Sequence, residues 1–243
     1  MVTIAAKLVG LTQPTISVEA SSAEELISYA ARVSNPSNQA NHKTASGLLK
    51  YCVKNKHWSV FEMVNAVIEV KAPRDITRQL LRHRSFSFQE FSQRYSDEIE
   101  FTDREFRRQD TKNRQNSIDD LSTEQKDNID FLVSDVQVVS NDTYKDLRAL
   151  GVAKECSRVV LPEGLTMSTL YVNGTLRSWL HYLDVRDDEG VTQWEHVLLA
   201  REIKKVLSPS FPTIMVPVDP SIRPMDEDEK KQALYRSMKN QYG

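Results

Sequence analysis

Glycine is scarce and widely spaced in this chain of 243 residues, and that spacing limits the folds open to it. The seven glycines stand far apart: Gly10, Gly47, Gly151, Gly164, Gly174, Gly190 and Gly243. No GxGxxG or GxxxxGK segment is present, so neither a Rossmann dinucleotide turn nor a phosphate loop is available. A bound nucleotide would have to be held by arginine and serine side chains and by helix N-termini.

Charge and cysteine content exclude further classes of protein. With 32 basic and 34 acidic residues, the formal net charge of -2 gives no general attraction to nucleic acid or to an acidic membrane surface. The N-terminus lacks the pattern of a signal peptide and no long apolar run occurs, so we expect a cytoplasmic protein. Cys52 and Cys156 are the only cysteines and form no CxxC pair, so we predict neither a disulfide scaffold nor a cysteine zinc site.

Hydrophobic periodicity in the N-terminal half predicts alternating strands and helices. Ser22 and Glu25 have the spacing of a capping box, which marks the start of a helix. The buried face of that helix is expected to carry Leu26, Tyr29, Ala30 and Val33. The other expected elements are a strand at 2–11, a helix at 44–54, a strand at 61–70, a helix opening with Pro73 and an extended segment at 85–88.

The C-terminal half opens with residues 102–128, which are polar, highly charged and without periodicity and so predict a long surface excursion. A helical stripe over 129–150 follows, with a candidate break at Asn141 and Gly151 as the stop. The remaining expected elements are a short helix ending before Pro162, a strand at 166–172, a helix from 176 with Arg177, His181 and Asp184 on its polar face, and a helix capped by Thr192 and Glu195 that stops before Pro209.

This order of elements predicts an α+β fold in which helices pack on a central mixed or antiparallel sheet. A hydrophobic content of 40% over this length supports one substantial core. We therefore expect a single catalytic domain at residues 1–220 and a charged C-terminal tail at 221–243.

Basic and hydroxyl side chains are concentrated in one segment, RHRSFSFQEFSQRY, at residues 82–95. Arginine forks match phosphate oxygens, and a glutamate among them can accept hydrogen bonds from a base or a ribose. An RHR triplet alone is more often a solvated turn. Phe86, Phe88 and Phe91 argue against that alternative here, because a solvated turn has little reason to be anchored in a core. The segment is therefore a candidate binding loop.

The same segment resembles the ThyX motif of flavin-dependent thymidylate synthases, in which RHR is followed by seven variable residues and a serine. Arg84 and Ser92 have that spacing, and Glu90, Arg94 and Tyr95 extend the match. Further stretches resemble the family in the same order, so that the similarity covers about residues 25–207. They are ARVS at 31–34, HWSVFE at 57–62, VKAP at 70–73, RVVLP at 158–162 and QWE at 193–195.

The resemblance implies a homotetramer with shared active sites and a flavin site that is not a Rossmann fold. It implies methylation of dUMP to dTMP with FAD, NADPH and methylenetetrahydrofolate. By position, the flavin contacts would be Ser59, Arg82, His83, Arg84, Glu90, Thr175, Arg177 and His181. The dUMP contacts would be Gln79, Arg82, Glu90, Ser92, Gln93, Arg94, Arg158 and Arg186. Arg186 is also the expected catalytic residue, because a cation beside the pyrimidine favours ionisation at N3.

The chain departs from the family pattern at three places. Thr175 stands where many members have asparagine, and Gln89 replaces the usual asparagine before Glu90. The histidine that follows the dUMP arginine in the family has no counterpart after Arg186.

Single residues could have purely structural roles, and the whole chain could belong to another functional class. Arg158 could cap a helix end, and Arg186 could pair with Asp187 or Asp188. A nucleic-acid binding protein would use Arg104, Arg107, Arg108 and Arg114 to follow phosphates. A metal-dependent nucleotide hydrolase is disfavoured, because the five histidines show no HxH or HExxH spacing and no metal site is predicted.

Overall fold

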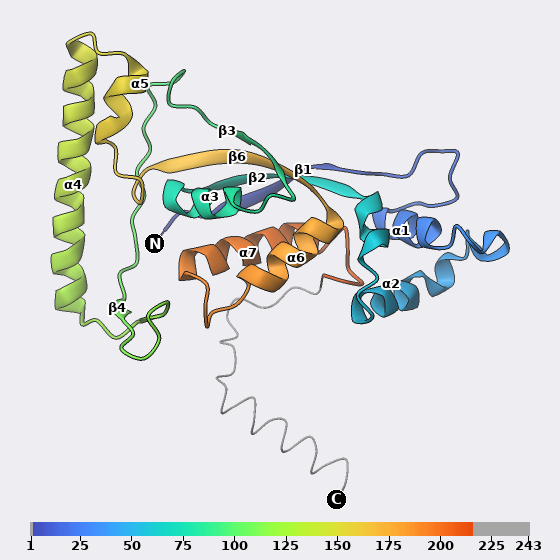
Figure 1. The fold of residues 1–243 in the computed structure, drawn as a ribbon. Helices are drawn as coiled ribbons and strands as arrows, with labels where there is room; N and C mark the ends of the chain where they lie inside the picture. The colour runs from blue at the N-terminus through green and yellow to red at the C-terminus, as the bar shows by residue number, and fades with distance from the viewer. Residues whose placement is uncertain (1, 216–243) are drawn as a thin grey trace, which may run out of the picture.

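The computed structural model describes residues 2–215, and its centre is a four-stranded sheet (Figure 1). The strands are β1 (Ala5–Leu11), β2 (Asn65–Pro73), β6 (Met167–Thr175) and β3 (Ser87–Glu90), in the order β1-β2-β6-β3. Every neighbouring pair is antiparallel. The expected α+β class is therefore confirmed, with an antiparallel rather than a mixed sheet.

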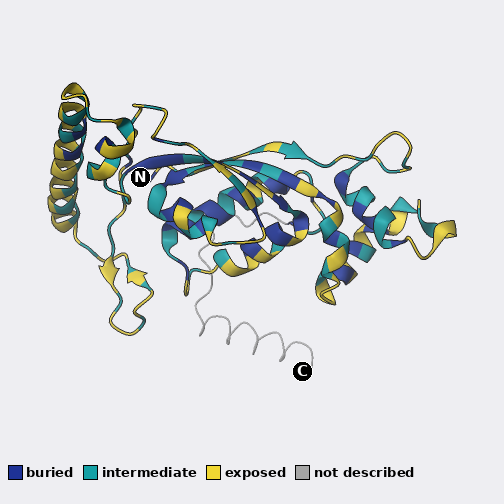
Figure 2. Ribbon diagram, turned by 45° about the horizontal axis from the view of Figure 1, so that its top comes forward, coloured by how far each residue is buried: buried dark blue, intermediate teal, exposed yellow. Residues whose placement is uncertain are grey.

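Three helices cover one face of this sheet: α3 (Arg74–Leu81), α6 (Leu176–Arg186) and α7 (Trp194–Leu207) (Figure 1). Alternate residues of β2, among them Ile68 and Val70, point into this layer and are fully buried. Tyr171, on the opposite face of β6, is 42% exposed. The core thus lies between one face of the sheet and the three helices, where the buried ribbon of Figure 2 is concentrated.

The helices α1 (Ala23–Ala31) and α2 (Ala45–Lys54) form one end of the molecule, with the short 3-10 turns η1 (Pro36–Asn38), η2 (His42–Thr44) and η3 (Trp58–Met63). Ser22 caps α1 as expected, since its side chain accepts from the backbone N–H of Glu25. Two details were wrong. The Glu25 carboxylate accepts hydrogen bonds from Ser21 instead of Ser22. The buried residues of α1 are Ala23, Ile27 and Ser28, while Val33 lies beyond the helix and is exposed.

The helix α4 (Thr123–Ala149) stands at the opposite end and is continuous, so the expected break at Asn141 does not occur. It begins earlier than predicted, because Ser122 and Gln125 form a capping box. Gly151 ends it with a φ of +83°. The short α5 (Lys154–Ser157) and the turn η4 (Arg158–Val160) follow, as expected before Pro162. Within residues 2–215, no helix has the length and apolar content needed to cross a membrane.

The segment predicted as a surface excursion, residues 102–128, does lie at the surface, with Thr102 its one buried residue, but it is also anchored to the domain. It contains the short strands β4 (Arg108–Gln109) and β5 (Ser117–Ile118), and Arg107 donates to the carboxylate of Glu195 at 2.8 Å. Because Glu195 is used in this way, the predicted capping box with Thr192 is wrong, and Gln193 occupies the N-cap of α7. The domain boundary expected at residue 220 and the tail at 221–243 lie outside the described residues.

Candidate functional site

The RHR segment forms the turn between α3 and β3, held in place by Phe86. The Phe86 ring packs on Trp179 with centroids 4.3 Å apart and is buried. It also lies against Gly174 of β6, where an added Cβ would come within 2.3 Å of the ring. Packing therefore fixes this turn. Arg82 and Arg84 beside it are exposed and make no side-chain hydrogen bond or ion pair with the described part of the chain.

His83 is the least exposed member of the triplet and is partly buried. Arg186, at the end of α6, donates from Nε to His83 Nε2 at 3.0 Å. Tyr182 packs edge-on against the same ring at 5.1 Å. Burial, and then the charges of Arg186, His181 and Arg82, lower the pKa of His83 to about 4. His83 is therefore neutral at pH 7 and acts as a hydrogen-bond acceptor for Arg186. The alternative pairing of Arg186 with Asp187 does not occur, because Asp187 pairs with Arg201 at 2.9 Å.

Gln79 lies in a group of side chains that sequence reasoning missed in part. Its amide contacts Gln193 at 2.7 Å and His196 at 3.1 Å, and His196 contacts the Tyr182 hydroxyl at 3.1 Å. Tyr182 and His196 are both fully buried. The available signal was helical spacing: Tyr182 lies three residues after Trp179 on α6, and His196 lies three residues before Leu199 on α7, so each shares the apolar face of its helix. A polar ring on such a face needs a buried partner.

A cleft of about 1060 Å³ lies between α6, η3 and the end of the described chain. Arg177 and His181 line it, as does Ser85, while its apolar wall includes Trp58 and Leu180. Arg177 pairs with Glu62 at 2.7 Å. The cationic Arg177, Lys56 and Lys204 beside an apolar wall are donors of the kind that a phosphate-bearing aromatic cofactor requires. The residues present therefore fit a flavin.

Six of the eight expected flavin contacts lie outside the cleft lining: Ser59, Arg82, His83, Arg84, Glu90 and Thr175. Ser59 is exposed on η3. Thr175 is the N-cap of α6, where its hydroxyl accepts from the backbone N–H of Ser178 at 3.3 Å. Hydrogen bonds from Thr175 and then Arg177 lower the pKa of Glu62, on the wall of this cleft. Threonine at position 175 thus has a structural role in starting α6.

The remaining expected substrate residues form a second group, beyond the end of β3. Arg94 donates to the Glu155 carboxylate at 3.2 Å, and Arg158 donates to the carbonyl oxygen of Glu155 at 3.3 Å. Since the Arg94 and Glu155 side chains are both more than half exposed, their ion pair is weak and open to exchange for another anion.

Three more of the expected residues, Glu90, Ser92 and Gln93, make hydrogen bonds close to this second group in the sequence. Ser168 donates to Glu90 at 2.9 Å, Arg74 donates to the buried Gln93, and Ser92 accepts from the backbone N–H of Arg94 at 3.3 Å. Over residues 2–215, no hydrogen bond or ion pair links this group directly to the group of Gln79, His83 and Arg186. In the described chain the expected substrate residues therefore form two groups that are not hydrogen-bonded to each other.

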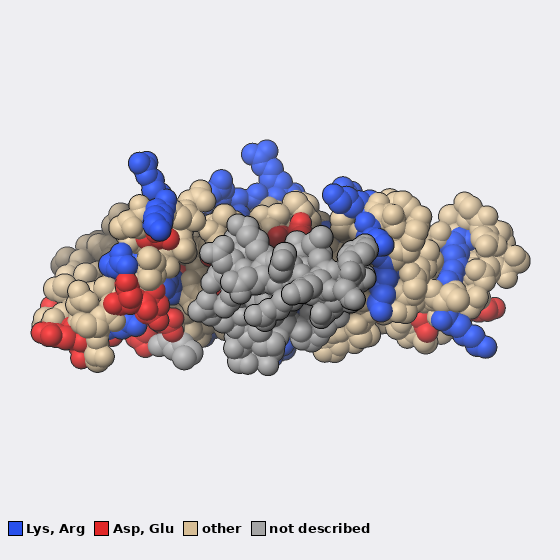
Figure 3. Space-filling model, turned by 90° about the horizontal axis from the view of Figure 1, so that it is seen from below, with Lys and Arg blue, Asp and Glu red and all other residues tan. Residues whose placement is uncertain are grey.

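The arginines of the nucleic-acid alternative are largely occupied. Arg104 pairs with Asp75 at 3.1 Å, Arg107 with Glu195 and Arg108 with Asp120. On the coloured part of the face in Figure 3, basic side chains are separated by uncharged surface and mix with acidic ones toward the α4 end. Among the described residues, no group of His, Cys, Asp or Glu has the arrangement of a metal site.

Comparison with known proteins agrees with this geometry. Residues 16–213 match the family described as thymidylate synthase complementing protein. The chain is 46% identical over 217 residues to a probable flavin-dependent thymidylate synthase of Paramecium bursaria Chlorella virus 1, covering 89% of this chain and 99% of that protein. It is 45% identical over 210 residues to the flavin-dependent thymidylate synthase of a Synechocystis strain, covering 86% and 96%.

A solved structure also resembles this chain in its fold. The UMP/dUMP methylase PolB from Streptomyces cacaoi, bound with 5-Br dUMP, matches with a TM-score of 0.74 and 27% identity over 88% of this chain and 94% of that one. In all three comparisons the match covers nearly the full length of the other protein. The chain therefore belongs to the family of flavin-dependent thymidylate synthases.

Proposed function

We propose that the chain methylates dUMP to dTMP with FAD as its flavin, NADPH as the reductant and methylenetetrahydrofolate as the carbon donor. The observation that carries this proposal is the contact between Arg186 and the neutral His83, beside two exposed arginines that have no acidic partner within residues 2–215. Such a group can bind an anionic nucleotide without a glycine-rich loop. Family membership gives the reaction class.

The flavin would be held by Arg177 and His181 in the cleft, and by Ser59, Thr175, Glu90 and the segment 82–84. Bound there, the reduced flavin would supply the hydride. Arg177 and His181 lie one turn apart on α6, so both side chains project from the same face toward one ligand. The apolar wall that includes Trp58 and Leu180 would keep water away from one side of an aromatic ring.

Arg186 would act on the pyrimidine. Its Nε is occupied by His83, so the guanidinium is held in one orientation and its Nη groups remain available to the base. A fixed cation at this position stabilises negative charge that develops on the ring. Because His83 is neutral, its contact with Arg186 does not cancel the positive charge of the guanidinium, which stays available to the substrate.

The proposed enzyme is a homotetramer with active sites shared between chains. Within residues 2–215 no hydrogen bond or ion pair joins the Glu90–Arg158 group to the Gln79–Arg186 group, which is the arrangement expected if a second copy completes each group. The helix α4 supports it as well, because Phe131, Leu132, Val136 and Val139 are between 47% and 66% exposed. A row of large apolar side chains in water marks an interaction surface. The proposed setting is the cytoplasm.

The test is a reconstitution of the purified full chain with FAD, followed by gel filtration and a visible spectrum. NADPH should bleach the oxidised flavin band, and dTMP should form when dUMP and methylenetetrahydrofolate are added. UMP should be assayed beside dUMP, because the related PolB is a UMP/dUMP methylase. A protein that retains no flavin, even with dUMP present, would overturn the proposal.

A further inference from the structure

A continuous series of hydrogen bonds runs from the core to the cavity beside the β4–β5 hairpin. Tyr182 contacts His196, His196 contacts Gln79, and Gln79 contacts Gln193. The Gln193 amide then reaches Glu195 at 3.0 Å. This series joins α6, α7 and α3 through side chains that no part of the proposed reaction uses except Gln79.

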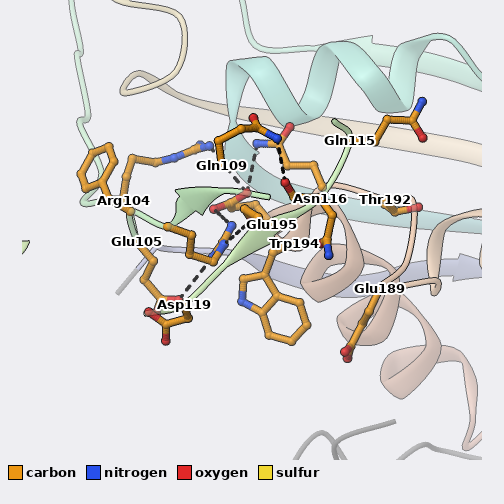
Figure 4. Close-up of a pocket in the computed structure, with 14 residues that line it drawn as sticks. Arg104, Glu105, Gln109, Gln115, Asn116, Asp119, Glu189, Thr192, Trp194 and Glu195 are labelled. Atoms are coloured by element: carbon orange, nitrogen blue, oxygen red, sulfur yellow. Dashed lines mark hydrogen bonds and ion pairs between the residues drawn. The ribbon is translucent and has the colours of Figure 1, made fainter. Parts of the chain in front are cut away.

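Glu195 is the charged end of the series. Its side chain is 3% exposed and accepts from Arg107 at 2.8 Å, with Arg104 3.9 Å away. Arg104 and Glu195 both lie in the cavity of about 700 Å³ shown in Figure 4. Burial works to raise the pKa of the Glu195 carboxyl, but its own backbone N–H, the two arginines and Gln193 outweigh burial and lower it. Glu195 is therefore an anion, which can only accept hydrogen bonds.

The anionic Glu195 determines which group is the donor and which is the acceptor in each hydrogen bond of this series. Gln193 must donate from Nε2 to Glu195, which leaves its Oε1 to face Gln79. Gln79 must then donate from Nε2, so its Oε1 accepts from His196. His196 therefore carries its proton on Nδ1, and its Nε2 accepts from the Tyr182 hydroxyl. The amide of Gln79 has one orientation only, and the second N–H of its Nε2 has no acceptor among residues 2–215.

We propose that Glu195, Gln193 and His196 are positioning residues that hold the Gln79 amide so that it presents an N–H, and not an oxygen, to an acceptor atom of dUMP. This inference rests on the proposed function, which assigns Gln79 to the substrate. A flipped amide would place its carbonyl oxygen against an acceptor atom and repel it. The anionic Glu195, on the far side of Gln193, thus sets the polarity of the substrate site.

His196 allows a matched test, because the asparagine and leucine side chains have the same number of heavy atoms and the same branch point. In His196→Asn, the amide nitrogen can take the place of Nδ1 and donate to Gln79. His196→Leu removes that donor but leaves a similar cavity. Both variants lose the bond to Tyr182, so their difference reports the bond to Gln79 alone. Gln79→Leu is the reference for complete loss of the donor.

The measurement is the Kd of dUMP for the full-length, FAD-reconstituted protein by calorimetry, with flavin content and melting temperature recorded for each variant. We expect His196→Asn to bind within about twofold of wild type, and His196→Leu and Gln79→Leu to bind about tenfold more weakly. Equal losses in the asparagine and leucine variants would show a packing effect and overturn the inference. Unchanged binding in either leucine variant would also overturn it.

The outcome for the wild type separates this inference from the proposed function. If the wild-type protein fails to bind dUMP, the proposed function is wrong, and the inference falls with it. If the wild type binds dUMP and His196→Leu binds equally well, only the positioning role is wrong.

Discussion

Arg186 donates from Nε to Nε2 of His83 over 3.0 Å, and this contact ties the end of α6 to the turn after α3. The two residues are 103 positions apart, so only the packing of α6 against that turn creates the pair. It orients a guanidinium with one nitrogen occupied and the others free. Replacement of either residue should therefore affect catalysis more than folding.

Arg186→Ala should lower kcat/KM for dUMP by about 100- to 1000-fold, because it removes a fixed cation at the pyrimidine. Flavin content should stay at the wild-type level, since the cleft is lined by other residues. NADPH-driven dTMP formation is the measurement. Arg114→Ala, in the exposed loop between β4 and β5, is the matched control and should behave as wild type. Near wild-type turnover of Arg186→Ala at saturating dUMP would show that the cation is not needed.

The His83 ring should respond directly to loss of Arg186. Its pKa of about 4 is caused first by burial and second by the Arg186 charge, so Arg186→Ala should raise it part of the way to the ordinary value of 6.5. The sign follows because removal of a positive neighbour favours the protonated ring. NMR titration of the His83 ring measures this shift. No upward movement would contradict the contact between the two side chains.

His196 should make the protein sensitive to acid. Its pKa is lowered from 6.5 to about 3, first by burial and then by Arg186 and His83. Between these values only the unfolded chain binds the proton, so stability is present above pH 6.5 and is lost as the pH falls toward 3. The loss from His196 alone should be about 2 kcal/mol between pH 7 and pH 5. Denaturant unfolding at both pH values measures it, and His196→Asn should show a smaller difference.

Gly174→Ala should destabilise the protein by about 1–3 kcal/mol, because the new Cβ would lie 2.3 Å from the Phe86 ring. Flavin binding should weaken too, since Phe86 anchors the turn that carries residues 82–84. Gly47→Ala is the control, for nothing lies within 4 Å of its Cβ position in α2. That change should be neutral or stabilising, by up to about 1 kcal/mol. Similar stability losses in both variants would contradict the close approach.

Val136→Asp combined with Val139→Asp should break the proposed assembly. The two side chains are 47% and 64% exposed on α4, so the isolated chain should fold with either residue, whereas a charge buried at an interface is costly. Light scattering should show a species smaller than four chains, with reduced activity that does not recover at high concentration. Glu124→Lys, in the first turn of α4, is the control for a change of charge alone. An unchanged mass would exclude this face from the assembly.

The order of elements could be predicted well because it depends on local patterns. The capping side chain of Ser22, the end of α4 at Gly151 and the helix with Ile76 and Leu80 buried are all set by residues close together in the chain. The prediction failed where a distant partner competed. Glu195 has the spacing of a capping residue, but Arg107, 88 positions away, takes its carboxylate.

The apolar stripe on α4 shows a second limit. Its period predicts a helix, and the helix is present, yet much of the stripe is exposed in the single chain. Periodicity reports that a face needs to be covered and not which surface covers it.

By itself, the sequence determined that no glycine-rich nucleotide loop exists, that an arginine-rich segment with an aromatic anchor takes its place, and which helices and strands surround it. Only the tertiary structure decided that His83 accepts from Arg186, that Gln79 is held between Gln193 and His196, and that Glu195 is a buried anion. The physical reason is range. Helix propensity and capping act over a few residues. Burial, charge and the direction of a hydrogen bond depend on partners that can lie more than a hundred positions away in the sequence.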